Sequence, residues 1–183
     1  MSRVYLVRHC QAAGQEPLAP LTDAGRSQAE TLARTWTDVG VSRIISSPYS
    51  RAVDSVLPLA ERLNLPVEED ERLMERVLST EPLPDWRDHL RRSFVDPDYG
   101  LPSGESGRVA TQRGLGCVQE VMADQNVNAV IVTHGNLLAL ILNHFDPTFG
   151  FDAWERLINP DIYRLDFTEA TTQIRRIEIG VND

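Results

Sequence analysis

The sequence has few cysteines, a shortage of basic residues and no long apolar run. Cys10 and Cys117 are its two cysteines, too few for a disulfide framework and typical of a reducing cytoplasm. Asp and Glu number 27 against 18 Lys and Arg, and the net charge of −9 makes nucleic acid and anionic membranes unfavourable partners. No apolar run approaches the ~20 residues that a membrane helix requires.

The N-terminal residues also lack the long apolar segment of a secretory signal peptide. Met1, Ser2 and Arg3 lead directly into a short strand-like run, so we expect a cytoplasmic protein. Apolar residues make up 42% of the chain and charged residues 25%, which is ordinary for a globular protein. We expect residues 1–183 to form a single domain, and the sequence leaves open whether two copies form a homodimer.

The order of the expected strands and helices predicts the fold class. Short apolar runs predict buried strands at 3–7, 43–46, 66–69 and 129–133. Helical periodicity predicts helices from Thr22 to Gly40 and at 49–63, 106–123 and 136–143. Alternating residues predict a closing hairpin of strands at 162–167 and 173–179, with its turn at 170–172. This order predicts an α/β three-layer sandwich with a mostly parallel central sheet.

The segment 75–104 interrupts this alternation of strands and helices. It is rich in Pro, Asp, Arg and Trp and has no clean periodicity. We therefore expect a small inserted cap, built of a helix and loops, beside the main sheet. Such a cap would help to select the substrate, and it offers four candidate contacts: Trp86, Arg87, Arg91 and Arg92.

Histidines and arginines follow three of the predicted strands. Arg8 and His9 follow the first strand, Arg51 lies a turn after the second, and His134 follows the fourth. Ligands of parallel α/β sheets bind outside the carboxyl ends of the strands, so we expect these side chains to converge. The guanidinium fork matches a phosphate edge, and a neutral imidazole is a good nucleophile toward phosphorus.

These residue types point to phosphoryl transfer, a reaction that depends mainly on stabilising charge. The helix predicted after His134 would add oriented backbone N–H groups for an anion. No cluster of aspartates indicates a magnesium site, so we expect protein cations to do the work of a metal, with no cofactor. The expected partner is a small phosphorylated substrate.

Six short segments, in chain order within residues 3–140, carry a family resemblance. They are VYLVRHC, PLTDAGRSQAETLA, ISSPYSRA, ERLMERV, LPSGES and VIVTHGN. Each alone is a weak signal, but together they resemble the motifs of the histidine phosphatase superfamily, the phosphoglycerate mutase-like proteins. The resemblance implies the phosphoglycerate mutase-like fold.

The resemblance also implies a two-step mechanism. His9 would attack the phosphorus and become a phosphohistidine, while Arg8, Arg51 and His134 bind the phosphoryl oxygens. Glu75 would protonate the leaving oxygen and then activate water, a role typically worth ~100- to 10,000-fold in rate. Gln15 is the nearest candidate for a further phosphate ligand that the family supplies as asparagine.

The segment around His9 departs from the family pattern. Cys10 stands where the family usually has glycine, and Ala12 replaces a usual Ser or Thr. A cationic pocket would lower the pKa of a thiol at position 10, but we interpret Cys10, like Cys117, as a small buried side chain. These departures bear on the identity of the substrate more than on the reaction.

Three functions remain open on the sequence. A metal-independent phosphomonoester hydrolase is the preferred one, because the short chain and modest cap would leave the site open to water. A phosphoglycerate mutase-type phosphoryl transfer is the alternative within enzymes. A non-catalytic phosphate-binding domain that kept the pocket is the alternative outside them.

Overall fold

The computed structural model describes residues 3–36, 39–124, 127–167 and 171–179. Its centre is a six-stranded sheet with the order β3-β2-β4-β1-β5-β6. The first four strands along the chain run parallel, and β5 is antiparallel to its neighbours β1 and β6. The strands are β1 (Arg3–Arg8), β2 (Arg43–Ser46), β3 (Val67–Glu69), β4 (Asn128–Thr133), β5 (Asp161–Phe167) and β6 (Thr172–Ile177).

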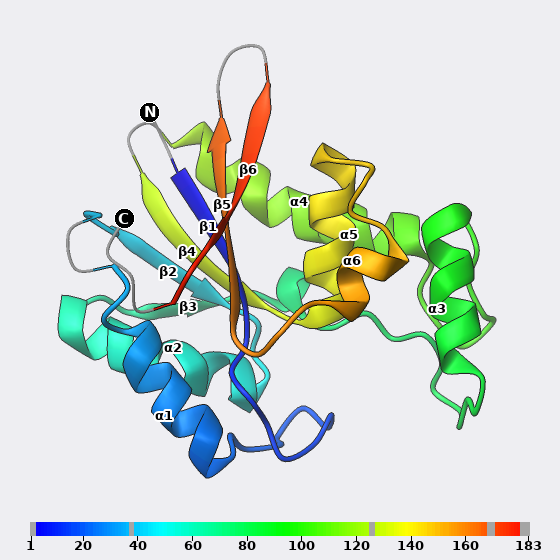
Figure 1. Cartoon of the computed structure of the whole chain (residues 1–183), viewed down its shortest axis with the longest axis horizontal. Helices are drawn as coiled ribbons and strands as arrows, with labels where there is room; N and C mark the ends of the chain where they lie inside the picture. Colours follow the sequence, from blue (N-terminus) through cyan, green and yellow to red (C-terminus); the bar gives the residue numbers. More distant parts are fainter. Residues whose placement is uncertain (1–2, 37–38, 125–126, 168–170, 180–183) are drawn as a thin grey trace.

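Helices cover both faces of this sheet, as Figure 1 shows. Helices α1 and α2 lie on one side, and α4 and α5 lie on the other. The expected three-layer α/β sandwich is therefore confirmed. The helices are α1 (Asp23–Leu32), α2 (Ser50–Leu63), the short 3-10 helix η1 (Glu71–Leu73), α3 (Trp86–Val95), α4 (Gly107–Ala123), α5 (Gly135–Phe145) and α6 (Phe151–Glu155).

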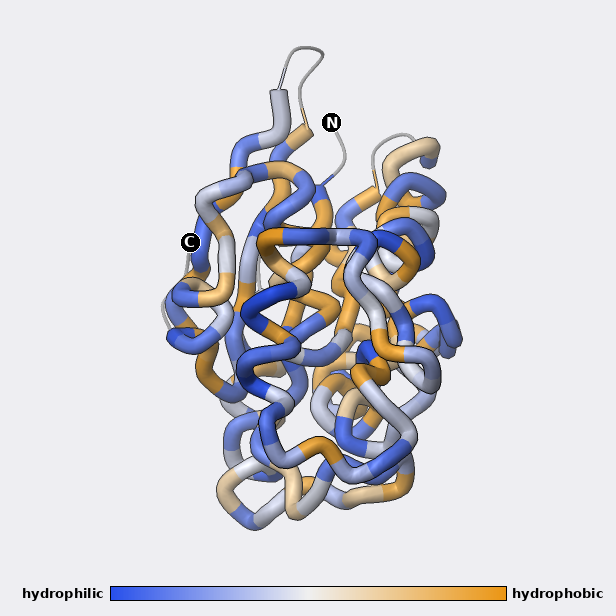
Figure 2. Tube along the Cα trace, turned by 90° about the vertical axis from the view of Figure 1, so that its right-hand side faces the viewer, coloured by the Kyte–Doolittle hydropathy of each residue, from blue (hydrophilic) through white to orange (hydrophobic). Residues whose placement is uncertain are grey.

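Alternation along β1 explains how one sheet supports two cores. Val4 and Leu6 pack toward α4 and α5, whereas Tyr5 and Val7 pack toward α1 and α2. All four side chains are buried, which is the pattern of a strand covered on both faces. In Figure 2 the hydrophobic parts of the trace run through the centre of the molecule. No helix in the described residues is long and apolar enough to cross a membrane.

The first helix is shorter than its apolar pattern predicts. Thr22 caps its start by accepting a hydrogen bond from the N–H of Gly25 at 3.0 Å. The helix ends at Leu32 instead of continuing to Gly40, so that prediction is wrong. Tight turns follow, in which the N–H of Thr35 bonds the carbonyl of Leu32. The turns still bury apolar residues, which is why the apolar spacing outlasts the helix.

The remaining predicted elements appear with small shifts at their ends. β5 and β6 pair as the expected antiparallel hairpin, and the turn predicted at 170–172 lies partly outside the described residues. The segment 75–104 contains α3, as expected for a helix with loops. Helix α6 was not expected, and it lies beside α3 (Figure 1), with Phe94 of α3 against Phe151 of α6.

Candidate active site

The register of the sheet brings the predicted site residues together. Arg8 at the end of β1 pairs with Thr133 at the end of β4, so His9 and His134 leave the sheet side by side. Their ring centroids are 5.1 Å apart. Arg51, in the first turn of α2, reaches the same place and contacts His9. The expected convergence of three strand ends is thus confirmed.

Two hydrogen bonds orient the imidazole of His9. Nδ1 lies 2.7 Å from the carbonyl oxygen of Cys10, and a carbonyl can only accept, so Nδ1 carries the proton. Nε2 therefore carries the lone pair, and it accepts a hydrogen bond from Nε of Arg51 at 3.2 Å. The backbone is fixed as well, because the carbonyl of His9 accepts from Nδ2 of Asn159 at 2.7 Å. The ring presents a single, defined nitrogen lone pair.

Burial and nearby cations keep both histidines neutral. Burial, followed by the charges of Arg51 and Arg8, lowers the pKa of His9 to about 4, although its bond to Cys10 acts in the opposite direction. Burial and the neighbouring His9 also lower the pKa of His134 well below its ordinary value. At neutral pH the lone pair on Nε2 of His9 is therefore available for attack on an electrophile.

The turn after His9 is held by Ser55 of α2. The Ser55 hydroxyl accepts a hydrogen bond from the N–H of Cys10 at 2.8 Å and donates one to the carbonyl of Arg51 at 2.6 Å. Cys10 is fully buried, and burial raises the pKa of its thiol to about 11. The neighbouring cations do not reverse this shift, so the interpretation of Cys10 as a small buried side chain is confirmed.

Arg51 joins the candidate nucleophile to the loop before α1. Its side chain is buried, and Nη1 donates to the carbonyls of Gln15 and Glu16 at 3.0 and 2.9 Å. Its guanidinium also lies over the ring of Tyr49, at 4.9 Å from the centroid. The bonds from Arg51 to the loop carbonyls and to Nε2 therefore hold the loop at a defined distance from His9.

Arg8 presents an unused donor to the same place. Its Nη1 donates to the carbonyl of Leu157 at 2.9 Å, whereas its buried Nε has no hydrogen-bond partner among the described residues. Gly135 packs directly against this guanidinium, because a Cβ at that position would lie 3.1 Å from Nε. A buried N–H without a partner is costly, and an anion beside it would satisfy it.

His134 has a similar unused nitrogen. It is fully buried, and Nε2 lies 2.7 Å from the hydroxyl oxygen of Ser47. That hydroxyl also accepts from the N–H of Tyr49 at 3.4 Å. Nδ1 of His134 has no hydrogen-bond partner among the described residues. The site thus offers an unpaired donor from Arg8 and an unpaired ring nitrogen from His134.

Glu75 occupies the N-terminus of α5, where the sequence predicts oriented N–H groups for an anion. Its carboxylate accepts from the backbone N–H groups of Asn136 and Leu137, each at 3.0 Å, and from that of Arg76 at 2.8 Å. The predicted anion at this helix end is therefore the carboxylate of Glu75 and not a phosphoryl group of the substrate. The helix end instead fixes the carboxylate of Glu75 beside the site.

A cavity of about 480 Å³ adjoins this cluster. Of the predicted site residues, it is lined by Arg8, Gln15 and Glu75, and of the predicted cap contacts by Trp86. The remaining lining residues are Arg76, Leu78, Leu90, Gly135, Asn136 and Trp154. These residues were not singled out from the sequence, although Arg76 follows Glu75 directly and Asn136 ends the quoted VIVTHGN segment.

Three predicted cap contacts do not line this cavity and brace α3 instead. Arg87 forms an ion pair with Glu155 of α6. The guanidinium of Arg91 lies over the ring of Phe151 at 4.3 Å, and that of Arg92 lies over Tyr99 at 4.1 Å. The partners of these arginines lie on other segments, so the sequence pattern of α3 alone could not predict the contacts.

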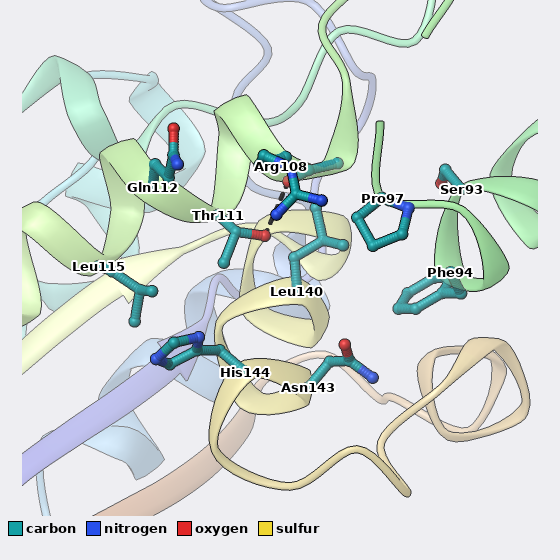
Figure 3. A pocket seen from close by; sticks show the side chains of 11 residues that line it. Ser93, Phe94, Pro97, Arg108, Thr111, Gln112, Leu115, Leu140, Asn143 and His144 are labelled. Atoms are coloured by element: carbon teal, nitrogen blue, oxygen red, sulfur yellow. Dashed lines mark hydrogen bonds between the residues drawn. The ribbon is translucent and has the colours of Figure 1, made fainter. Parts of the chain in front are cut away.

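A second cavity, of about 270 Å³, lies between α3, α4 and α5 (Figure 3). None of the predicted site residues lines it. Its Arg108 pairs with Asp98 at 2.8 Å, and the amide of its Asn143 donates to the carbonyls of Pro147 and Phe149. Because these groups already have partners within the chain, the first cavity is the better candidate site for an anion.

No group of three or more His, Cys, Asp or Glu side chains that could hold a metal ion occurs in the part of the chain that the structure describes. The charged groups that face the candidate site are Arg8, Arg51, Arg76 and Glu75. Three cations against one carboxylate give a local positive charge within an acidic protein. Such an arrangement stabilises a phosphoryl group electrostatically.

Comparison with known proteins agrees with this chemistry. The family model described as "Histidine phosphatase superfamily (branch 1)" matches residues 4–180. A probable phosphoglycerate mutase GpmB from Shigella dysenteriae serotype 1 is 29% identical over 194 residues, which cover 93% of this chain and 87% of the relative.

Solved structures share the fold. Bacillus stearothermophilus YhfR superposes with a TM-score of 0.78 at 22% identity and covers 96% of both chains. A mycobacterial glucosyl-3-phosphoglycerate phosphatase, in complex with inorganic phosphate, gives a TM-score of 0.74 at 24% identity, covering 98% of this chain and 97% of that one. At these identities the two structures support the fold, and the family match carries the relationship.

Proposed function

The chain belongs to the histidine phosphatase superfamily, and we propose that it hydrolyses a small phosphomonoester through a phosphohistidine at His9, without a metal ion. The observation that carries this proposal is the state of His9. Its proton sits on Nδ1, its lone pair sits on Nε2, and burial keeps it neutral beside two arginines. We also propose a cytoplasmic location, which the two free thiols support.

The first step transfers the phosphoryl group to the protein. Nε2 of His9 forms a bond to phosphorus as the bond from phosphorus to the ester oxygen breaks. The carboxylic acid form of Glu75 gives its proton to the departing oxygen, which leaves as an alcohol. Arg8, Arg51 and His134 supply donors to the phosphoryl oxygens, and the unpaired Nε of Arg8 and Nδ1 of His134 support that role.

The second step returns the site to its starting state. The carboxylate of Glu75 takes a proton from water, whose oxygen bonds to phosphorus as the bond to Nε2 breaks. Inorganic phosphate leaves, and His9 is neutral again. Glu75 lines the same cavity as Arg8 and Gln15, which supports this role, and its three backbone hydrogen bonds fix its position.

A mutase is the second candidate function. The relative named as a probable phosphoglycerate mutase favours it, because the same half-reaction could pass the phosphoryl group to a hydroxyl of an acceptor. The cavity of about 480 Å³ is large for a three-carbon acid and leaves room for water, which favours hydrolysis. A non-catalytic phosphate-binding domain would keep Arg8 and Arg51 but would need no oriented lone pair on His9.

Turnover of p-nitrophenyl phosphate, with and without a chelator, tests the proposal. We expect activity that survives the chelator and falls at least about 1,000-fold in His9→Ala. When a reaction with a ³²P-labelled substrate is quenched rapidly without acid, the wild type should carry an acid-labile phosphoryl group. The His9→Ala variant should carry none. No turnover across a broad panel of phosphomonoesters would overturn the proposal and favour the binding domain, and phosphate transfer to added glycerate would favour the mutase.

A further inference from the structure

The cavity beside the catalytic cluster is lined by both polar and apolar side chains. Arg8, Arg76 and Asn136 form its polar part, next to His9 and Glu75. Leu78, Leu90 and the two indole rings of Trp86 and Trp154 form the apolar part. A phosphate bound at the polar part would leave the apolar part for the rest of the ester.

The two indoles contact each other although Trp86 is on α3 and Trp154 is on α6. The rings of Trp86 and Trp154 meet edge to face, with centroids 5.9 Å apart and planes at 85°. The ion pair between Arg87 and Glu155 joins the two helices directly next to the rings. Arg87 also lies over the Trp86 ring at 5.7 Å. A wall already held in place costs little to order on binding.

Trp86 keeps exposed ring surface in addition to its contacts with Trp154 and Arg87. Trp86 is 40% exposed, although indole is among the side chains that gain most from burial. By contrast, Trp36, on the other side of the sheet, is 2% exposed. A ligand with an apolar ring would cover surface on Trp86 that the chain itself leaves in water.

The polar part also has unmet hydrogen-bonding capacity. Asn136 is 7% exposed, and neither its Nδ2 nor its Oδ1 has a partner among the described residues. Its amide can donate to a phosphoryl oxygen and accept from a hydroxyl of the same ligand. The cavity therefore suits a ligand that carries both a polar group and an apolar group.

We propose that this site selects phosphomonoesters whose alcohol carries an aromatic ring, with the ring against Trp86 and Trp154. The inference rests on the proposed function, because it needs the phosphate to lie at Arg8 and His9. Aromatic side chains gain from edge-to-face and offset contact beyond the burial of area, so the indole pair favours a flat ring over a short aliphatic chain. The volume of about 480 Å³ accommodates a phosphate together with a bicyclic ring.

The test compares esters that share one leaving group. 2-(1-Naphthyl)ethyl phosphate and ethyl phosphate both release a primary alcohol, so the difference in kcat/KM reports on the ring and not on the chemistry of the bond. We expect the naphthyl ester to have a kcat/KM at least about tenfold higher, with most of the difference in KM. Equal values for the two esters would overturn the inference while leaving the proposed function standing.

Variants then locate the contact. Trp86→Ala and Trp154→Ala should each bring the ratio of the two kcat/KM values toward one, whereas Trp86→Phe should keep most of it. The ratio is measured within one preparation, so it does not depend on the folded fraction of a variant. Val95→Ala is the control, because Val95 is 83% exposed on the same helix as Trp86 and does not line the cavity. An unchanged ratio in both tryptophan-to-alanine variants would overturn the inference.

Failure of the proposed function would look different. If the wild type hydrolysed neither these two esters nor any of the broad panel, the function would be overturned, and calorimetric binding of the two esters to His9→Ala would decide the ring preference by itself. The inference would be supported if His9→Ala bound the naphthyl ester more tightly and if this preference were lost when Trp86→Ala was added to His9→Ala. Equal affinities would overturn it.

Discussion

The Nε–H of Arg51 donates a hydrogen bond to Nε2 of His9 across 3.2 Å, so the lone pair proposed for attack already has a partner in the ligand-free site. A phosphate that binds Arg51 would draw this donor away and free Nε2 next to phosphorus. The same arginine holds the carbonyls of Gln15 and Glu16 through Nη1. Because the guanidinium is a rigid plane, Arg51 links the position of this loop to that of the imidazole of His9.

This geometry makes Arg51→Lys a sensitive test. Lysine donates from one nitrogen only, so it cannot occupy both the position of Nε beside His9 and that of Nη1 beside the loop carbonyls. We expect kcat/KM to fall about 100-fold, which is the usual effect of losing one preorganised donor. Steady-state kinetics on p-nitrophenyl phosphate checks this, with Arg62→Lys as the matched control because Arg62 is exposed on the same helix. A loss of less than about threefold would contradict the role given to Arg51.

Glu75→Gln separates proton transfer from helix capping. An amide keeps the shape of the carboxylate but cannot protonate a leaving oxygen, so esters with poor leaving groups should lose about 100-fold in kcat. Esters with good leaving groups need no proton and should lose far less. The measurement is the ratio of the two rates in each protein, and Glu71→Gln, at an exposed neighbouring position, is the control.

Equal losses for good and poor leaving groups would contradict the general-acid role of Glu75. In that case the carboxylate would serve as a cap for α5 through its bonds to Asn136 and Leu137. The variant also replaces one of its two acceptor oxygens with an amide, so we expect the free energy of unfolding to fall by about 1–3 kcal/mol. Chemical denaturation checks that change independently of catalysis.

The buried environment of His9 predicts a low titration midpoint. Its pKa is lowered from an ordinary 6.5 to about 4, so the ring should stay neutral through the weakly acidic range. Between these two values the unfolded chain takes up a proton that the folded chain does not, and stability should therefore fall as the pH falls. An NMR titration of the ring Cε1–H, assigned by comparison with His9→Asn, measures the midpoint. A midpoint at or above 6.5 would contradict the burial argument.

Burial should also protect both cysteines. It raises the pKa of Cys10 to about 11 and that of Cys117 to about 12. Because the thiolate is the reactive form, alkylation by iodoacetamide at pH 8 should be at least about 100-fold slower in the native protein than in denaturant. Peptide mapping by mass spectrometry distinguishes the two sites. Rapid native labelling of Cys10 would indicate a reactive thiol beside His9.

Residues that follow strands could be placed from the sequence because parallel strands end at one edge. Arg8, His9 and His134 directly follow apolar runs, so their convergence required only that those runs pair as parallel neighbours. The motif resemblance reinforced the placement, and the family match agrees with it. Of the predicted cap contacts, Trp86 lines the cavity. Arg87, Arg91 and Arg92 do not, and they contact Glu155, Phe151 and Tyr99 instead.

Contacts between distant segments could not be placed in this way. Asn159 holds the carbonyl of His9 from 150 positions away in the chain, and no local pattern records that bond. Helix α6 is too short for periodicity to reveal, yet it brings Trp154 against Trp86. The engagement of the α5 N-terminus by Glu75 likewise depends on how the segment after β3 returns to the sheet.

The sequence by itself determined the layered α/β fold, the family and the residue types at the strand ends, because apolar spacing and short motifs are local properties. The tertiary structure alone decided the state of His9. Its tautomer depends on the backbone carbonyl of Cys10, its low pKa depends on burial and on the charges of Arg51 and Arg8, and the lone pair on Nε2 accepts a hydrogen bond from Arg51. Desolvation and hydrogen-bond geometry depend on how atoms pack in three dimensions, so they cannot be predicted from the order of the residues alone.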